Sequence, residues 1–419
     1  MRDITTAEAP ARGTKGAITV ALCLAVAVLE GFDIQALGVA APRLAPELGL
    51  DPRQMGWLFA ISSIGILAGA SVGGRLADRV GRKPVFVAAV LVFGVFTLAT
   101  TAVSGFAGVF LTRTIAGLGF GAALPIMIAM AAEISPPQQR SFTAAAMFSG
   151  MPFGGTLAAG VTQLLPGSAD WRALFYIGGV LPLLLVPAML RWLPETYRPM
   201  VASSAATAAA ATTRRSIATA LFGEGRTATT LLLWLTFLPT LLMLYIVLNW
   251  LPTLVAAQGL DRAIAPQASL WFNVAGVCGG LLLSKAVDRF GFRWPVSLAF
   301  AGLIVALVAL GAAQSVGASL ALSGLAGFFL LGANFSLYGV AAACYPMDVR
   351  GTGSGAAVAV GRIGSVVGPL LAGLLLSQGR SASDVIVYMA PCAAIAGLAV
   401  FALSLQRRRQ SATTNKATG

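Results

Sequence analysis

The feature that most constrains this chain is a succession of apolar runs, each long enough to cross a lipid bilayer. A spanning helix needs about 20 mostly apolar residues, and the sequence supplies about twelve such runs between charged or Pro- and Gly-rich breaks. Hydrophobic residues make up 57% of the chain and charged residues 10%, whereas soluble domains carry about 25% charged residues. The sequence therefore predicts an all-α integral membrane protein with spans near 17–42, 55–76, 84–104, 106–131, 141–165, 172–193, 229–256, 267–287, 294–314, 317–343, 352–377 and 384–405.

The Lys and Arg residues indicate how these helices are oriented. Cytoplasmic loops carry an excess of basic residues, and most of the 28 Lys and Arg residues lie in loops that are cytoplasmic when both ends of the chain are inside. The same bias explains most of the net charge of +13, so nucleic-acid binding is not indicated. The first apolar run continues past Glu30 and Asp33 with no small-residue cleavage site before it, which argues against a cleaved signal peptide.

The longest polar interval, rich in Ala, Ser, Thr and Arg, divides the chain into two similar parts. Asp78 recurs as Asp288 and Arg140 recurs as Arg350 at one common offset. Such a repeat predicts duplicated halves of about six helices, an architecture of secondary transporters that bind substrate near mid-membrane between the halves. We predict a cytoplasmic N-terminal tail, an N-terminal half, a cytoplasmic linker, a C-terminal half and a cytoplasmic C-terminal tail at 1–16, 17–193, 194–228, 229–405 and 406–419, respectively.

The first cytoplasmic loop, which reads GRLADRVGRKP from Gly74 to Pro84, combines a sharp turn with alternating charge. Its glycines let helix ends approach closely, and Asp78 can pair with basic groups or a helix N-terminus and so hold one conformation. The alternative is a simple positive-inside anchor. A weaker copy covers residues 285–293. We predict a role in conformational gating for Gly74, Asp78, Arg79, Gly81, Arg82, Asp288, Arg289 and Arg350.

An acid pair lies inside the first predicted span. Glu30 and Asp33 are about one helical turn apart and therefore share a helix face. Ionisable groups within a membrane are costly and are usually functional. The chain has no histidine, so a proton-coupled cycle would have to use carboxylates. We predict that Asp33 and Glu30 carry the proton; the alternative is a structural ion pair with Arg113 of the fourth span.

Two arginines inside predicted spans are candidates for binding an anion. Arg113 lies in the fourth span, and Arg362 lies in the eleventh, where the repeat-related position is Pro152. A guanidinium can bind a carboxylate through two parallel hydrogen bonds. Polar and aromatic residues at similar depth would suit an aromatic ring that carries a carboxylate and a hydroxyl, although each alone is more often a packing residue. They are Gln35, Tyr245, Asn249, Trp250, Trp271, Asn273, Asn334, Phe335 and Tyr338.

Several segments carry a resemblance to a known family: EGFDIQALG from Glu30, the loop from Gly74, and YPMDVRGTGSGAAVAVGRIGSVVGPLLAG from Tyr345. They resemble the aromatic acid:proton symporters of the major facilitator superfamily, and the resemblance covers nearly the whole chain. LLLWLTFLPTLLMLYIVLNWLP and GAALPIMIAMAAEISPPQQR look most like members that import 3-(3-hydroxyphenyl)propionate. The resemblance implies uptake of this or a related aromatic carboxylate with a proton, across the bacterial inner membrane, for the catabolism of aromatic compounds.

The family's functional residues match this sequence at the first-span acids, the loop aspartates and the arginines. Many members of the family have aspartate at the position of Glu30, so this chain departs from the family's pattern there. We expect a monomer in a lipid bilayer whose partners are the aromatic acid and the proton, with no cofactor, metal or nucleic acid.

Two other functions are alternatives. An exporter is suggested by Gly150–Gly155, which partly resembles the proline-glycine motif of drug antiporters, although Met151 interrupts the glycine-proline dipeptide. A membrane enzyme or sensor is disfavoured because the chain has no histidine and no Gly-Lys-Ser/Thr phosphate loop. We therefore expect no enzymatic activity.

Overall fold

The computed structural model describes residues 14–135, 140–164, 170–195, 216–259, 261 and 264–417, and all regular secondary structure in these ranges is helical. Eleven helices of the described residues are long and apolar enough to cross a membrane. The remaining predicted span coincides with α5 (Arg140–Leu164). The predicted all-α, multi-pass membrane fold is confirmed. Much of the predicted N-terminal tail and linker, at residues 1–13 and 196–215, lies outside the described residues.

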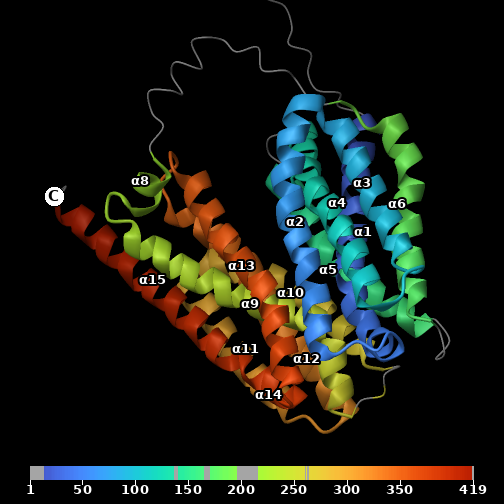
Figure 1. Cartoon of the computed structure of the whole chain (residues 1–419). Helices are drawn as coiled ribbons and strands as arrows, with labels where there is room; N and C mark the ends of the chain where they lie inside the picture. Colours follow the sequence, from blue (N-terminus) through green and yellow to red (C-terminus); the bar gives the residue numbers. More distant parts are fainter. Residues whose placement is uncertain are drawn as a thin grey trace, which may run out of the picture. The chain divides into compact units, whose positions relative to one another are not determined.

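The chain forms two compact units, of which the first comprises residues 1–36, 61–161 and 168–198. It contains most of α1 (Thr14–Glu47), α2 (Pro52–Val80) and α5, and the whole of α3 (Arg82–Ala99), α4 (Gly105–Ile134) and α6 (Arg172–Trp192), which Figure 1 draws in blue to green. Helix α3 packs against α4 and α6. The stacked rings of Phe93 and Phe120, with centroids 4.5 Å apart, belong to the buried hydrophobic core of this unit.

Glycines allow α1 and α5 to touch backbone to backbone in the first unit. A Cβ on Gly31 would collide with the main chain of Met151, and one on Gly154 would collide with the carbonyl of Val28. Both residues of α5 belong to the segment that partly resembles the antiporter motif. In this structure the segment therefore serves close helix packing.

The second unit comprises residues 37–60, 162–167 and 199–419. Within it, α9 packs against α13 and α15, and α10 packs against α12. Helix α15 continues through most of the predicted C-terminal tail, and the break before it follows the short capped helix α14. The helices of this unit, drawn in yellow-green to red in Figure 1, are α8 (Ile217–Phe222), α9 (Thr227–Ala257), α10 (Pro266–Phe290), α11 (Arg293–Gly311), α12 (Val316–Cys344), α13 (Arg350–Ser377), α14 (Ala382–Val387) and α15 (Met389–Ala417).

The start of α2 lies on α13 within the second unit. The Trp250 indole Nε1 donates to the Pro369 carbonyl at 3.1 Å, and the Phe59 ring meets the Trp250 ring edge to face at 5.1 Å. A Cβ on Gly373 would lie 2.5 Å from the carbonyl oxygen of Pro52. The two helices therefore approach so closely here that only glycine fits on α13.

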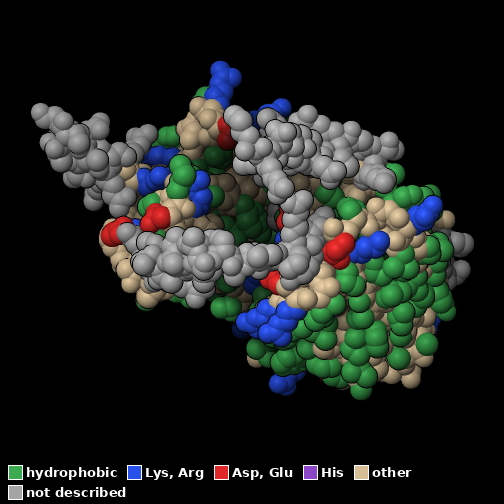
Figure 2. Space-filling view, turned by 90° about the horizontal axis from the view of Figure 1, so that it is seen from above, with side chains coloured by type: hydrophobic (Ala, Val, Ile, Leu, Met, Phe, Trp, Pro, Cys, Tyr) green, Lys and Arg blue, Asp and Glu red, His purple; other side chains and the backbone are tan. Residues whose placement is uncertain are grey.

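Many large apolar side chains lie exposed on the outer surface of the helices. Figure 2, which looks onto one end of the helices, shows hydrophobic side chains over the flank at the lower right and Lys, Arg, Asp and Glu side chains mainly around the end that faces the viewer. Large exposed apolar side chains include Leu111, Leu184, Leu281, Val305 and Leu398. So much exposed apolar surface is expected of a protein that faces lipid.

Candidate functional site

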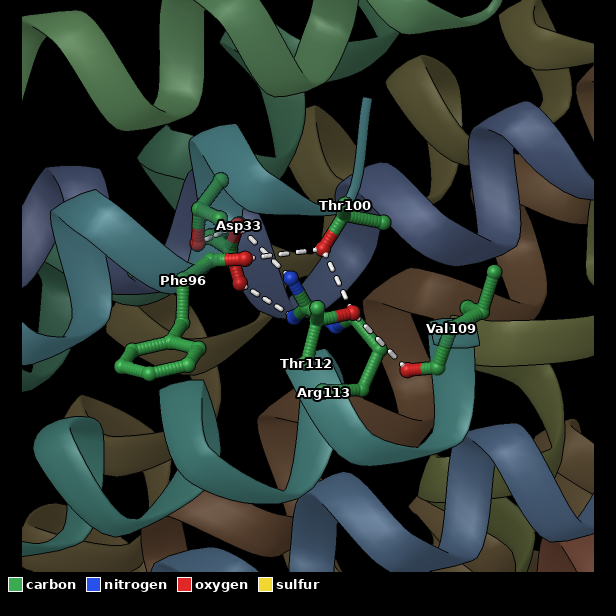
Figure 3. A network of polar contacts seen from close by, with 7 residues as sticks. Asp33, Phe96, Thr100, Val109, Thr112 and Arg113 are labelled. Atoms are coloured by element: carbon green, nitrogen blue, oxygen red, sulfur yellow. Dashed lines mark hydrogen bonds and ion pairs between the residues drawn. The ribbon is translucent and has the colours of Figure 1, made fainter. Parts of the chain in front are cut away.

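A buried ion pair joins α1 to α4 in the first unit. The side chains of Asp33 and Arg113 are 0% and 1% exposed. Arg113 Nη1 donates to Asp33 Oδ1 at 3.1 Å, and Nη2 is paired with Oδ2 (Figure 3). This pairing is the alternative to a proton carrier that the sequence left open. The structure brings the two residues together, and both nitrogens of the guanidinium fork are engaged by one carboxylate.

Further contacts from α3 and α6 hold the pair. The Thr97 hydroxyl donates to Asp33 Oδ1 at 2.8 Å, and the Arg113 guanidinium lies 5.7 Å from the centroid of the Phe175 ring. Sequence reasoning missed Thr97 and Phe175, because a lone threonine or phenylalanine in an apolar helix has no distinguishing pattern. The nearby hydroxyls of Thr100 and Thr112 bond to each other at 3.1 Å and to their own helices (Figure 3).

The other predicted residues of α1 are also buried. Glu30, about one turn before Asp33, is 1% exposed. Gln35 is buried against Gly155 of α5, where any Cβ would overlap the Gln35 amide. Glycine at position 155 therefore makes room for this polar side chain.

A second polar cluster lies in the second unit, built by α9, α12 and α13. Arg362 Nη1 donates to the Tyr245 hydroxyl at 2.9 Å. The side chains of Tyr338 and Asn334, one turn apart on α12, interact with each other, and the Phe237 ring lies edge-on to the Tyr338 ring, with their centroids 5.7 Å apart. Arg362 and Tyr338 are only partly buried. The cluster thus brings together the guanidinium of Arg362, the phenols of Tyr245 and Tyr338, and the Phe237 ring.

Two predicted binding residues are turned toward their own helices. The amide of Asn249 donates to the Tyr245 carbonyl at 2.7 Å, and that of Asn273 donates to the Ser269 carbonyl at 2.8 Å. Both side chains are buried. Each amide nitrogen therefore satisfies a helix carbonyl.

The loop between α2 and α3 is bonded to the residues that follow α6. Glu195 accepts hydrogen bonds from the backbone N–H groups of Arg82 at 3.0 Å and Lys83 at 3.2 Å, and the Arg82 guanidinium forms an ion pair with Glu133. A carboxylate is favourable there because a helix N-terminus carries partial positive charge. Gly81 has φ of 111°, which favours glycine. Sequence reasoning missed Glu195 and Glu133, which lie far from the loop in the chain.

The remaining predicted gating residues lie at helix ends. Asp78 and Arg79 are exposed at the end of α2, and Arg350 is exposed at the start of α13. Asp288 and Arg289 are exposed at the end of α10, where the Arg289 guanidinium lies 5.3 Å from the Phe290 ring centroid. At Gly74 a Cβ would meet nothing within 4 Å, so no packing constraint requires glycine there.

A multi-pass helical protein that buries a charge pair in one unit and a guanidinium cluster in another has the construction of a secondary transporter. Its family is identified by comparison with known sequences: the family model described as "Major Facilitator Superfamily" matches residues 23–280 and 259–419. The chain therefore belongs to the major facilitator superfamily. Because this is a family of transporters, the expectation that the chain is not an enzyme is confirmed.

Similar proteins agree with this assignment. The 3-(3-hydroxy-phenyl)propionate transporter of Escherichia coli (strain K12) is 39% identical over 392 residues, which cover 94% of this chain and 95% of that protein. The 4-hydroxybenzoate transporter PcaK of Pseudomonas putida is 31% identical, with 92% of each chain covered. A crystal structure of a bacterial homologue of the human lysosomal transporter Spinster matches with a TM-score of 0.76 at 16% identity, covering 93% of this chain and 97% of that one.

Proposed function

We propose that this chain is a proton-coupled importer of an aromatic carboxylate, with 3-(3-hydroxyphenyl)propionate as the first candidate substrate. The bacterial relatives named for 3-(3-hydroxy-phenyl)propionate and 4-hydroxybenzoate support the substrate class. The observation that carries the coupling is the buried ion pair of Asp33 and Arg113. The proposal includes a monomer in the bacterial inner membrane with both termini in the cytoplasm, in line with the distribution of Lys and Arg.

Charge balance couples the proton to the substrate. Protonation of Asp33 alone would leave Arg113 as a buried cation without its counter-charge, which is costly. Binding of the substrate anion alone would add a negative charge to the transmembrane region. When both bind, the net charge of the buried groups is unchanged, so the empty ionised state and the fully loaded state are both favoured over the half-loaded states.

The arginines have different roles in this scheme. Arg362, partly exposed and hydrogen-bonded to Tyr245, and Arg113 are the two groups proposed to bind the carboxylate through a guanidinium fork. Arg113 becomes available to an anion only after protonation releases Asp33. Glu30, buried on the same helix, is a second proton-carrying group, and Gln35, Asn249, Asn273, Asn334 and Tyr338 complete the proposed substrate-binding set.

The cytoplasmic loops act as the gate of an alternating-access cycle. Bound ligands shift the equilibrium between two arrangements only when they bind one of them more tightly. Glu195 fixes the start of α3 in the present arrangement by capping the N–H groups of Arg82 and Lys83. Asp78 and Asp288 are proposed to stabilise one of the two states, as the repeat of their loop suggests.

The experiment is uptake into liposomes that contain the purified protein. Labelled 3-(3-hydroxyphenyl)propionate is supplied with and without an inward proton gradient, with benzoate or a cationic drug as competitor. We expect uptake that the gradient stimulates and that benzoate, but not the drug, inhibits. The proposal fails if no aromatic acid is taken up while the protein exchanges the cationic drug for protons, because that result identifies an exporter.

A further inference from the structure

We propose that Asn334 is a specificity-determining residue that accepts a hydrogen bond from a ring hydroxyl, so that the preferred substrates are hydroxylated aromatic acids. The inference rests on the proposed function and deepens it, because an aromatic carboxylate alone would not require this residue. It is carried by the second-unit cluster of Arg362, Tyr245, Tyr338 and Asn334.

The side chain of Asn334 is buried, and its amide oxygen is unsatisfied. It is 4% exposed, and its Oδ1 has no hydrogen-bond partner within the described part of the chain. The polar group next to it on α12 is the Tyr338 phenol, with which the Asn334 side chain interacts. A buried acceptor without a donor is unfavourable and rare in folded proteins. An unmet acceptor in this position is well suited to a ligand that brings a donor.

The other buried asparagines of the second unit differ from Asn334. The amides of Asn249 and Asn273 bond to carbonyls of their own helices, and neither side-chain oxygen is among the buried atoms that lack a partner in the described ranges. Among the predicted asparagines, only Asn334 combines burial with an unmet side-chain acceptor within the residues described. Asn334 is therefore a better candidate than Asn249 or Asn273 for a hydrogen bond to the substrate.

The chemistry of the cluster identifies the ligand group. A carboxylate is an acceptor only, so it suits the guanidinium of Arg362 and cannot satisfy Asn334 Oδ1. The Tyr245 hydroxyl accepts from Arg362 and keeps its own hydrogen as a donor. The cluster therefore offers a ligand two kinds of group. The Arg362 guanidinium and the Tyr245 hydroxyl can donate hydrogen bonds, and Asn334 Oδ1 can accept one. A molecule with a carboxylate on one side and a hydroxyl donor on its ring complements this pattern.

The expected discrimination follows from the cost of an unmet acceptor. A substrate that lacks the hydroxyl leaves Asn334 Oδ1 without a partner, which corresponds to roughly 10- to 100-fold weaker uptake. Sites that hydrogen-bond a substrate hydroxyl reject analogues without it far better than apolar pockets reject a missing methylene. The effect should therefore be measurable as a ratio of two uptake rates.

The test compares initial uptake of 3-(3-hydroxyphenyl)propionate with that of 3-phenylpropionate, which differs only by the ring hydroxyl, in proteoliposomes. We expect the wild-type protein to prefer the hydroxylated acid by roughly 10- to 100-fold. Asn334→Leu should reduce this ratio to about one, mainly by loss of uptake of the hydroxylated acid. Ser336→Ala is the matched control on α12, because the Ser336 hydroxyl bonds to the Gly332 carbonyl of its own helix; it should keep the wild-type ratio.

The outcomes separate the two proposals. Equal uptake of both acids by the wild-type protein overturns the role of Asn334 while leaving the proposed function intact, and it needs no variant that folds. A wild-type preference that persists in Asn334→Leu, or in Asn334→Ala should the leucine variant not fold, also overturns it. Uptake of neither acid overturns both proposals.

Discussion

Removing one charge of the pair formed by Asp33 and Arg113 should destabilise the protein far more than removing both. Each side chain is at most 1% exposed, so the survivor of a single substitution is a buried charge without compensation. Breaking such a pair costs about 3–5 kcal/mol, whereas replacing both partners by well-packed apolar residues of similar volume is often neutral or stabilising. We therefore expect about 3–5 kcal/mol for Asp33→Asn and for Arg113→Gln, and much less than their sum for the double variant.

The assay is denaturant unfolding of the purified variants in detergent micelles, read as a double-mutant cycle. Asp288→Asn, at an exposed position of α10, is the matched control and should leave the free energy of unfolding unchanged. Additive losses in the double variant would show that the two charges do not compensate each other. That result would refute the electrostatic reasoning on which the coupling scheme depends.

Other predictions concern single contacts. Thr97→Val removes a hydroxyl that donates to the Asp33 carboxylate and should lower the free energy of unfolding by about 1.5–3 kcal/mol; no change in denaturant unfolding would mean that the bond contributes nothing. Glu195→Ala removes the carboxylate cap of α3 and should cost about 0.5–2 kcal/mol in the same measurement, and an increase in stability would contradict the capping role. Gly373→Ala should slow uptake several-fold, because the added Cβ would lie 2.5 Å from a carbonyl of α2. Gly351→Ala, where a Cβ meets nothing within 4 Å, is the control. Equal uptake rates of the two variants would show that the contact at Gly373 is not tight.

Much of the fold could be predicted from the sequence because the bilayer imposes its own length scale. Each apolar run of about 20 residues had to become a helix, since backbone groups in lipid need internal hydrogen bonds. The helix ends were less predictable. Helix α1 continues past Pro42 and Pro46 to Glu47, and α15 continues to Ala417, because prolines and polar residues near a span's end do not by themselves stop a helix.

The site was predictable in its charges and not in its contacts. Asp33 and Arg113 stand out as ionisable residues in apolar helices, and a buried charge needs a partner. Thr97 donates to the Asp33 carboxylate, and Glu195 accepts from the backbone N–H of Arg82. Both partners lie far away in the chain, and nothing in the segments around Thr97 and Glu195 distinguishes these two residues. The proximity of Asn334 and Tyr338 follows from helical spacing. The unmet oxygen of Asn334, however, depends on which face of α12 meets α9 and α13, and a single sequence does not reveal that.

The measurement that tests the coupling most directly is proton entry driven by substrate alone. Liposomes with an internal pH indicator receive 3-(3-hydroxyphenyl)propionate without an imposed proton gradient, and protein-free liposomes correct for passive diffusion of the undissociated acid. We expect the wild-type protein to accelerate internal acidification in constant proportion to labelled substrate uptake, and Asp33→Asn to abolish this acidification. Substrate uptake by the wild-type protein with no acidification beyond the protein-free baseline would contradict proton symport through Asp33.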